Sequence, residues 1–461
     1  MWARASACVG GESCPIVERM DSCPRNRQYP LSLLTALSLC GACTAEDELV
    51  DGMFTQAEWT KIQTLSPLEE LPPDATNRYA DDPKAATLGQ KFFFESALAG
   101  PLKLGDDGMN GALGKVGEKG KVACASCHSG PWLIDLRSQP GNVSFGADVL
   151  PRNAATMINV AYYFPWIEND GLLDSLWSES MIDIEADFSY NSSRLRLAHV
   201  VYEKYRDEYN AVFDPDLDPA LDPAHPEADR FPAEGRPGSE EWLGMMTSDQ
   251  DHVTEIYVNW GKALHAYLRL LVSKNAPFDR YVAGDTAAID TAAKRGLKLF
   301  VGKAGCVECH SSPHFSDDDF RNNGLAPSGP NVNPDELGRF ATVEFIMGHE
   351  FNTKSKWSDD RADTRLDGLK KTDDLQGKWR TKGLRSIAET APYMHSGQFA
   401  TLEEVIDFYD KGGSETGFHG TKDPVIQPLN LSDGERGDLV AFLRTLTGEE
   451  VPEALLRDTR P

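Results

Sequence analysis

The sequence predicts a mostly α-helical fold made of two similar halves with long irregular loops. Few stretches of the 461-residue chain show the alternation of apolar and polar side chains that marks a β-strand. Two segments with apolar residues at helical spacing, 88–94 and 295–300, each precede a pair of closely spaced cysteines, which indicates an internal repeat. Because the chain is longer than one ordinary domain, we expect two or three domains.

The beginning of the chain, residues 1–45, is predicted to be a leader that directs export rather than part of a folded domain. Arg25 and Arg27 precede an apolar run over residues 31–42. A run of this length is typical of a signal peptide and is too short to span a bilayer comfortably. The predicted location of the protein is therefore the periplasm.

The end of this leader resembles a bacterial lipoprotein cleavage box, in which the residue after the cut is a lipidated cysteine. Small residues come directly before Cys43, although Cys40 stands where leucine is usual. We therefore expect lipidation of Cys43 to anchor the protein to a bacterial membrane. Met20 is an alternative to Met1 as the start of the chain.

The chain is strongly acidic, with a formal net charge of −26. This balance argues against nucleic-acid binding, which depends on clustered positive charge. Two interpretations of the acidity stay open: it provides solubility, or it steers a basic redox partner towards the protein. A periplasmic electron-donor or substrate protein would be such a partner.

The cysteines outside the leader form two CxxCH motifs, one ending in His128 and the other in His310. In this spacing the two thiols add to the vinyl groups of a haem, and the adjacent histidine ligates the iron. A zinc site would need further Cys or His partners, and the sequence after the leader has no other cysteine. The predicted residues of two covalent haem c groups are Cys124, Cys127, His128, Cys306, Cys309 and His310.

Each motif defines a predicted cytochrome c-like haem domain, the first over residues 46–284 and the second over residues 285–461. Two long irregular loops are expected within the first domain. The stretch 100–121 is rich in Gly and Lys and is expected to be a surface insertion. The stretch 214–240 is rich in Asp, Pro and Glu and is expected to be solvated.

Three further segments are predicted to be helices because their apolar residues recur at helical spacing. They are residues 258–273, 401–409 and 432–446. In the last of these, Ser432 is placed to cap the N-terminus, and Glu435 follows at the spacing of a capping box.

Beyond the haem motifs, several short segments carry a more specific pattern. They are residues 152–156, 174–177, 315–317, 323–325, 383–385 and 391–397. Together they resemble the bacterial di-haem cytochrome c peroxidase family, and within it the MauG-like branch. The resemblance covers roughly residues 80–450. It implies an oxidoreductase that uses hydrogen peroxide and acts on an electron-donor protein or on an aromatic residue of a partner protein.

The resemblance implies that the two haems differ in their second axial ligand. Ordinary family members place a methionine fourteen residues after the histidine of an APYxH segment; here that histidine is His395 and the position is Tyr409. Tyr409 is then the expected ligand, as in the MauG-like branch, and a phenolate favours ferric and higher-valent iron. The alternative is an ordinary aromatic side chain on a helix. No histidine occurs between His128 and His199, so the N-terminal haem is expected to be open and peroxide-reactive.

The resemblance also implies a calcium ion between the haems. The matching positions are Asn153 and the backbone carbonyls of Thr390 and Pro392. Oxygen ligands of this kind suit calcium.

Two positions depart from the family pattern where electrons pass between the haems. Asn169 stands in place of a tryptophan, and Leu172 stands in place of an arginine. Trp166 lies three residues from Asn169 and could substitute for the tryptophan, but core packing is an equally good interpretation of Trp166.

A third departure concerns acid–base chemistry. The family glutamate that helps to break the O–O bond corresponds to Ser189, whose hydroxyl has no useful pKa. Glu185 and Asp187 lie nearby and, with Trp166, are the remaining catalytic candidates. Two functions are therefore weighed: a peroxidase or MauG-like oxidoreductase that reacts with hydrogen peroxide, and a catalytically decayed di-haem electron-transfer protein.

Overall fold

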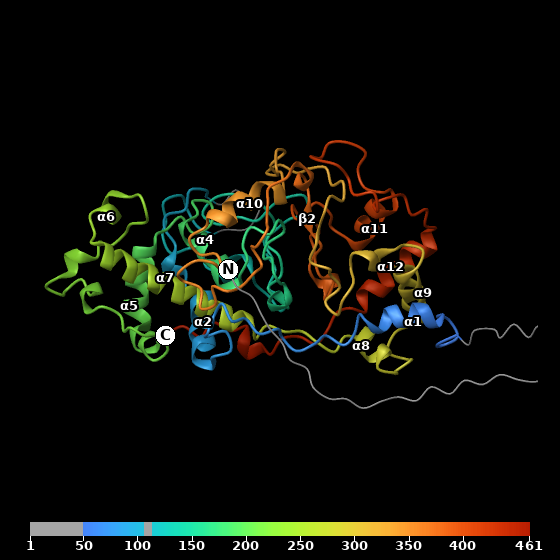
Figure 1. Ribbon diagram of the computed structural model, residues 1–461, viewed down its shortest axis with the longest axis horizontal. Coiled ribbons are helices and arrows are strands. Elements are labelled where there is room, and N and C mark those ends of the chain that lie inside the picture. The colour runs from blue at the N-terminus through green and yellow to red at the C-terminus, as the bar shows by residue number, and fades with distance from the viewer. Residues whose placement is uncertain (1–48, 106–112) are drawn as a thin grey trace, which may run out of the picture. The chain divides into compact units, whose positions relative to one another are not determined.

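A computed structural model describes residues 49–105 and 113–461, and helices dominate this part of the chain (Figure 1). The predicted leader, with Cys43, and part of the predicted insertion at 100–121 lie outside the described residues. The α-helices are α1 Gln56–Gln63, α2 Pro83–Phe94, α3 Cys124–Cys127, α4 Leu176–Glu185, α5 Arg194–Asn210, α6 Glu240–Leu243, α7 Thr247–Leu268, α8 Pro277–Val282, α9 Thr291–Val301, α10 Arg339–Gly348, α11 Leu402–Asp410 and α12 Asp433–Arg444.

Within the described residues the strands are short and form one antiparallel pair. Strand β1, Phe320–Arg321, pairs with β2, Trp379–Arg380, so that Phe320 faces Arg380 and Arg321 faces Trp379. The mostly α-helical class predicted from the sequence is confirmed. No helix of this part of the chain is both long enough and apolar enough to cross a membrane.

The internal repeat corresponds to two similar helix pairs. Helix α2 packs on α7 in the first half, and α9 packs on α12 in the second. Each contact is close because a glycine stands at the crossing: a Cβ atom on Gly89 would overlap the carbonyl oxygen of Ala263, and one on Gly296 would overlap that of Asp438. The glycines therefore let the two backbones approach more closely than any side chain would allow.

The predicted helix ends agree with the structure to different degrees. Helix α12 begins after Ser432, and the capping box with Glu435 is formed as predicted. Helix α7 begins at Thr247, eleven residues before the predicted start at 258, and ends at Leu268 rather than 273. Its earlier turns carry buried side chains such as Val253 and Ile256, which the prediction did not include.

The apolar side chains form two large cores. The first is drawn mainly from α2, α4, α5 and α7, and the second mainly from α8, α9, α11 and α12. Phe54, Ile62 and Leu65 belong to the second core although they stand at the start of the chain. The division of the cores therefore does not coincide with the predicted domain boundary at residue 284.

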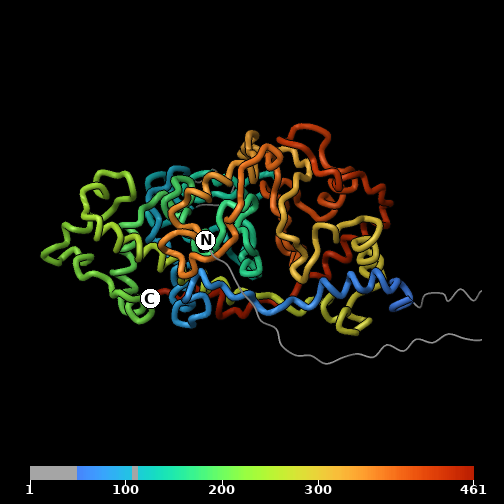
Figure 2. The backbone as a smooth tube through the Cα atoms, viewed as in Figure 1, coloured from blue at the N-terminus to red at the C-terminus, as the bar shows by residue number. Residues whose placement is uncertain are grey.

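The long loop after α10 reaches back from the second half to the first, and appears in orange in Figure 2. Phe351 packs in the first core, where its ring contacts Tyr257. The carboxylate of Asp359 forms an ion pair of 2.7 Å with Lys262 of α7. These contacts tie the two halves together through side chains that are distant in sequence.

The expectation of a solvated loop over residues 214–240 is only partly correct. Its acidic residues Asp216 and Glu227 are exposed, but Leu217, Leu221 and Phe231 are buried in the first core. The composition of the segment is dominated by Asp, Pro and Glu, so these few apolar anchors did not stand out in the sequence.

Candidate di-haem site

The first CxxCH motif starts on the short helix α3 and ends at His128. Neither thiol forms a disulfide, and both lie beside polar neighbours: Tyr190 Oη is 3.3 Å from Cys124 Sγ, and Arg137 donates to Cys127 Sγ over 3.3 Å. Burial raises the pKa of each thiol to about 12. Burial also lowers the pKa of the His128 ring, which favours the neutral imidazole that ligates iron.

The second motif begins on a single 3-10 turn at Cys306 and ends at His310. Gly305 starts this turn in the left-handed region, with φ of 65°, where a side chain would be strained. His310 Nδ1 lies 3.0 Å from the carbonyl oxygen of Phe315. If Nδ1 donates in this bond, Nε2 is the nitrogen left to ligate a metal. Burial lowers the pKa of this ring as well.

The residues present at both motifs fit a covalently attached haem. Each motif offers two thiols free of disulfides and one neutral, half-buried imidazole at the spacing that thioether attachment requires. His128 and His310 are therefore the residues that would hold the two irons.

Tyr409 is brought to the second motif by helix α11. Withdrawal from water raises the pKa of its phenol; a hydrogen bond of 3.3 Å from Asn323 Nδ2 opposes that shift, and the thiols of Cys309 and Cys306 lie near enough to reinforce it. Tyr409, the predicted ligand, therefore lies beside the second CxxCH motif, although about a hundred residues of sequence separate the two.

The first motif has instead a group of carboxyls on the side of helix α4. Glu179 and Asp183 stand one helical turn apart, and both act on the thiol of Cys124. Burial raises the pKa of Glu179 well above its usual range, and the nearby Glu168 and Asp183 reinforce the shift. Burial also raises the pKa of Asp183 to about 7, although a hydrogen bond from Ser189 opposes this.

Glu179 and Asp183 are not among the catalytic candidates predicted from the sequence. The one available signal was their spacing, four residues apart on a helix capped by Ser175. That spacing is equally typical of two charges on a solvated helix face, so only the packing of α4 reveals their location.

The two carboxylates nominated from the sequence have other partners. Glu185 accepts two hydrogen bonds of 2.9 Å from the guanidinium of Arg194. Asp187 is half exposed and pairs with Lys103 and Arg236 over about 3 Å, which lowers the pKa of its carboxyl. These contacts favour a structural role for both carboxylates.

Ser189, which replaces the family glutamate, is buried and lies beside Asp183, to which its hydroxyl is hydrogen bonded. A side chain without a useful pKa thus stands next to a carboxyl whose pKa is near neutrality.

Trp166, the other catalytic candidate, packs against two neighbouring side chains. The guanidinium of Arg339 lies 3.9 Å from the centre of its indole, and the ring of Phe320 lies 6.3 Å away. Asn169 is buried, and its carbonyl accepts a hydrogen bond of 2.7 Å from the backbone of Arg380 in β2.

Two of the three predicted calcium positions lie close together. Asn153 Nδ2 is 3.5 Å from the carbonyl oxygen of Pro392, and Asn153 Oδ1 accepts a hydrogen bond from Ser138. A cation at this point would require the amide to turn so that its oxygen faces Pro392. The Thr390 hydroxyl donates to the carbonyl of Ile387 over 3.3 Å, which leaves its backbone carbonyl as the predicted ligand.

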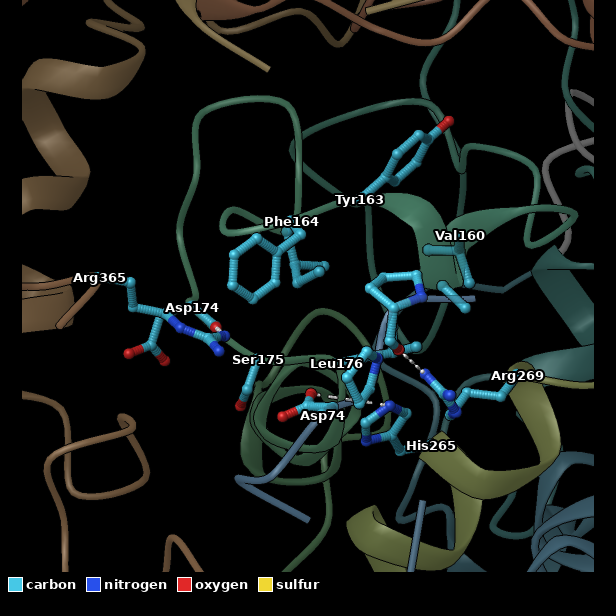
Figure 3. Close-up of a pocket in the computed structure, with 14 residues that line it drawn as sticks. Asp74, Val160, Tyr163, Phe164, Asp174, Ser175, Leu176, His265, Arg269 and Arg365 are labelled. Carbon is cyan, nitrogen blue, oxygen red and sulfur yellow. Dashed lines mark hydrogen bonds and ion pairs between the residues drawn. The ribbon is translucent and has the colours of Figure 1, made fainter. Parts of the chain in front are cut away.

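The cavity in Figure 3 is a separate feature, lined by Asp74, His265 and Arg269 among others and by none of the motif cysteines. Its volume is about 20 Å³, which suits a water molecule and not a haem. Burial lowers the pKa of His265 to about 4, so this ring is neutral near pH 7.

Two c-type haem attachment motifs, each beside its own helical core, define the chain as a di-haem c-type cytochrome. A family model described as di-haem cytochrome c peroxidase matches residues 83–287. The methylamine utilization protein MauG of Methylorubrum extorquens is 30% identical over 429 residues, which cover 91% of this chain and 95% of that protein. The chain belongs to the di-haem cytochrome c peroxidase family, an oxidoreductase family whose members carry two covalent haem c groups.

A second relative is more similar over a shorter stretch. Cytochrome-c peroxidase IdrP2 of Denitromonas iodatirespirans is 38% identical over 372 residues, which cover 78% of this chain and 81% of that protein. Among solved structures, a MauG-like protein associated with microbial copper homeostasis superposes with a TM-score of 0.56 at 22% identity, over 85% of this chain and 98% of that chain. This similarity supports the fold.

Proposed function

We propose that the protein is a periplasmic, MauG-like di-haem peroxidase in which hydrogen peroxide reacts at the His128 site and the His310 site exchanges electrons with it. The observation that carries this proposal is the contrast between the two sites: buried carboxyls at the first and Tyr409 at the second. When bound, the haem groups supply the redox chemistry that takes peroxide, two electrons and two protons to two molecules of water.

The carboxyl pair on α4 would move the protons. Reduction of peroxide would require one peroxide oxygen to lose a proton and the leaving oxygen to gain one. Asp183, with a pKa of about 7, can accept the first proton, while Glu179, with the more strongly raised pKa, can stay protonated and donate. Environments that separate the pKa values of two neighbouring carboxyls assign one as base and one as acid.

Tyr409 would close the second site. Its phenol oxygen receives a hydrogen bond from Asn323, which opposes the rise in pKa caused by burial and so acts towards the phenolate form needed for an iron ligand. An anionic oxygen ligand stabilises the oxidised states of iron relative to the reduced state. The second site would therefore hold an oxidising equivalent rather than bind peroxide.

Calcium, export and lipid anchoring are further parts of the proposal. The approach of Asn153 to the Pro392 carbonyl supports calcium binding by amide and carbonyl oxygens. The apolar run before Cys43 supports export and lipidation. Electrons would come from a periplasmic donor protein or from an aromatic residue of a partner protein, and the net charge of −26 would attract a basic partner.

A second candidate function is a di-haem electron-transfer protein that has lost peroxidase activity. It is favoured by Asn169, Leu172 and Ser189, which replace residues expected in active relatives. The two candidates differ in one respect, because only the first requires the protein to react with peroxide.

Stopped-flow mixing of the diferric protein with one equivalent of hydrogen peroxide distinguishes them. The proposed function predicts rapid changes in the Soret and near-infrared absorption of the wild type. An unchanged spectrum would reject it. In that case Ser189→Glu combined with Asn169→Trp should create the reactivity, as the decayed-enzyme hypothesis requires.

A further inference from the structure

We infer that Trp379, stacked on His395, is the relay through which electrons pass between the two haem sites. The inference rests on the proposed function only for its physiological direction, because electron exchange between the haems can be measured without peroxide. Trp379 lies between residues that contact the two motifs.

Strand β2 joins the indole to the second motif. In the register of the two strands Trp379 faces Arg321, whose guanidinium pairs with Asp317 over 2.6 Å. The backbone N–H of Asp317 donates to the carbonyl of Cys309 over 3.0 Å. Three residues after Trp379, the backbone of Lys382 lies beside the ring of His310.

The segment 152–155 joins the indole to the first motif. The guanidinium of Arg152 lies 5.0 Å from the centre of the Trp379 ring, and the backbone of Ala155 lies beside the ring of His128. The N–H of Asn153, between them, donates to the carbonyl of His395 over 3.0 Å. In Figure 1, β2 accordingly lies between the helices of the first core and those of the second.

The side chains around the indole form a closely packed aromatic bridge. The rings of Trp379 and His395 are stacked, with 3.8 Å between centroids and 16° between planes. Asp170 pairs with Arg152 over 2.6 Å and compensates its charge. The stacked rings therefore lie beside a guanidinium that is already paired with a carboxylate.

Trp379 is better placed than Trp166 for this task. Trp166 packs against Arg339 and Phe320, whereas the ring of Trp379 contacts both His395 and Arg152. Asn169 meets β2 through its own backbone, because its carbonyl accepts the N–H of Arg380. The strand that carries Trp379 therefore meets the chain at Asn169, the position where the sequence lacks the expected tryptophan.

The step itself is a one-electron exchange. With both haems bound, one electron would pass from the haem held by His310 through Trp379 to the haem held by His128, so that the His310 haem loses one electron and the His128 haem gains it. The indole returns to its starting state, and no bond is made or broken. Repeating the step supplies the second electron that peroxide reduction consumes.

Pulse radiolysis of the holoprotein tests the relay directly. One electron is delivered to the diferric protein by a radiolytic reductant, and its redistribution between the two haems is followed in the visible spectrum. Trp379→Leu removes the aromatic ring, Trp379→Phe keeps a stacking ring, and Trp166→Phe is the matched control. Haem content and electron paramagnetic resonance signals establish that each variant retains both sites.

The relay predicts that Trp379→Leu slows the redistribution about tenfold or more, which corresponds to about 1.4 kcal/mol of barrier. Trp379→Phe should fall between that variant and the wild type, and Trp166→Phe should match the wild type. A wild-type rate in Trp379→Leu, or equal slowing by Trp166→Phe, would overturn the assignment. If Trp379→Leu loses haem, Trp379→Phe is compared with Trp166→Phe instead. Slower redistribution in Trp379→Phe alone supports the relay, and equal rates in the two variants overturn it. A protein that exchanges electrons but ignores peroxide would reject the proposed function and not the relay.

Discussion

Asn323 Nδ2 donates a hydrogen bond to the phenol oxygen of Tyr409 over 3.3 Å, from a loop that follows the second CxxCH motif to a helix 86 residues further on. The bond holds the phenol at the motif and favours its anionic form. It is the contact on which the proposed difference between the two haem sites depends most.

Replacement of Tyr409 should change the electronic state of the second haem and leave the first unchanged. Tyr409→Met exchanges a hard oxygen ligand for a thioether, so the reduction potential of that haem should rise. Tyr409→Phe leaves no ligand atom, so the same haem should become high-spin. Potentiometric titration and electron paramagnetic resonance measure the two effects. A potential that does not move in Tyr409→Met would contradict ligation by Tyr409.

The carboxyl pair on α4 should control the rate at which peroxide reacts. Because a positioned acid or base contributes about 10²–10⁴-fold to such a step, Glu179→Gln with Asp183→Asn should slow the reaction by about 100-fold or more. Asp187→Asn is the matched control, since Asp187 is half exposed and paired with Lys103 and Arg236. Stopped-flow spectra give the rates, and equal losses in the pair and the control would count against the acid–base role.

The same reaction should depend on pH. Asp183 has a pKa of about 7, so it is protonated below that value and is available as a base above it. The rate of reaction with peroxide should therefore rise with pH through a midpoint near 7. Asp183→Asn should remove this step from the profile. A rate that falls as pH rises through 7 would show that the carboxyl acts only as a proton donor.

The close helix contacts predict an effect on stability. Gly89→Ala and Gly296→Ala would each force two backbones apart, which should lower the free energy of unfolding by about 1–3 kcal/mol or more. Gly437→Ala is the control, because a Cβ there would meet nothing within 4 Å, and this change should be neutral or stabilise by about 0.4–1 kcal/mol. Chemical unfolding of the holoprotein provides the comparison, and equal effects at all three glycines would contradict the packing account.

Local patterns in the sequence predicted the features that depend on local spacing. Helical periodicity identified the repeated helices, the capping box at Ser432 marked the start of α12, and the CxxCH spacing identified the two motifs. The prediction of Tyr409 came instead from the resemblance to the di-haem peroxidase family, and the structure places this residue beside Cys309 and Cys306.

Features that depend on tertiary packing were not predicted. In the sequence, Glu179 and Asp183 have the pattern of ordinary charges on a helix. Only the packing of α4 shows that they lie beside Cys124. Trp379 lies in a two-residue strand that no periodicity could indicate, and its stacking partner His395 is sixteen residues away. The joining of Phe54 to the second core likewise depends on a long-range contact.

The central claim is that the two haem sites are unequal, with the His128 site open and the His310 site closed by Tyr409. An electron paramagnetic resonance spectrum of the diferric holoprotein tests it most directly. We expect one high-spin ferric signal from the first haem and one low-spin signal with histidine–tyrosine ligation from the second. Two low-spin signals, or a second haem that is also high-spin, would contradict it.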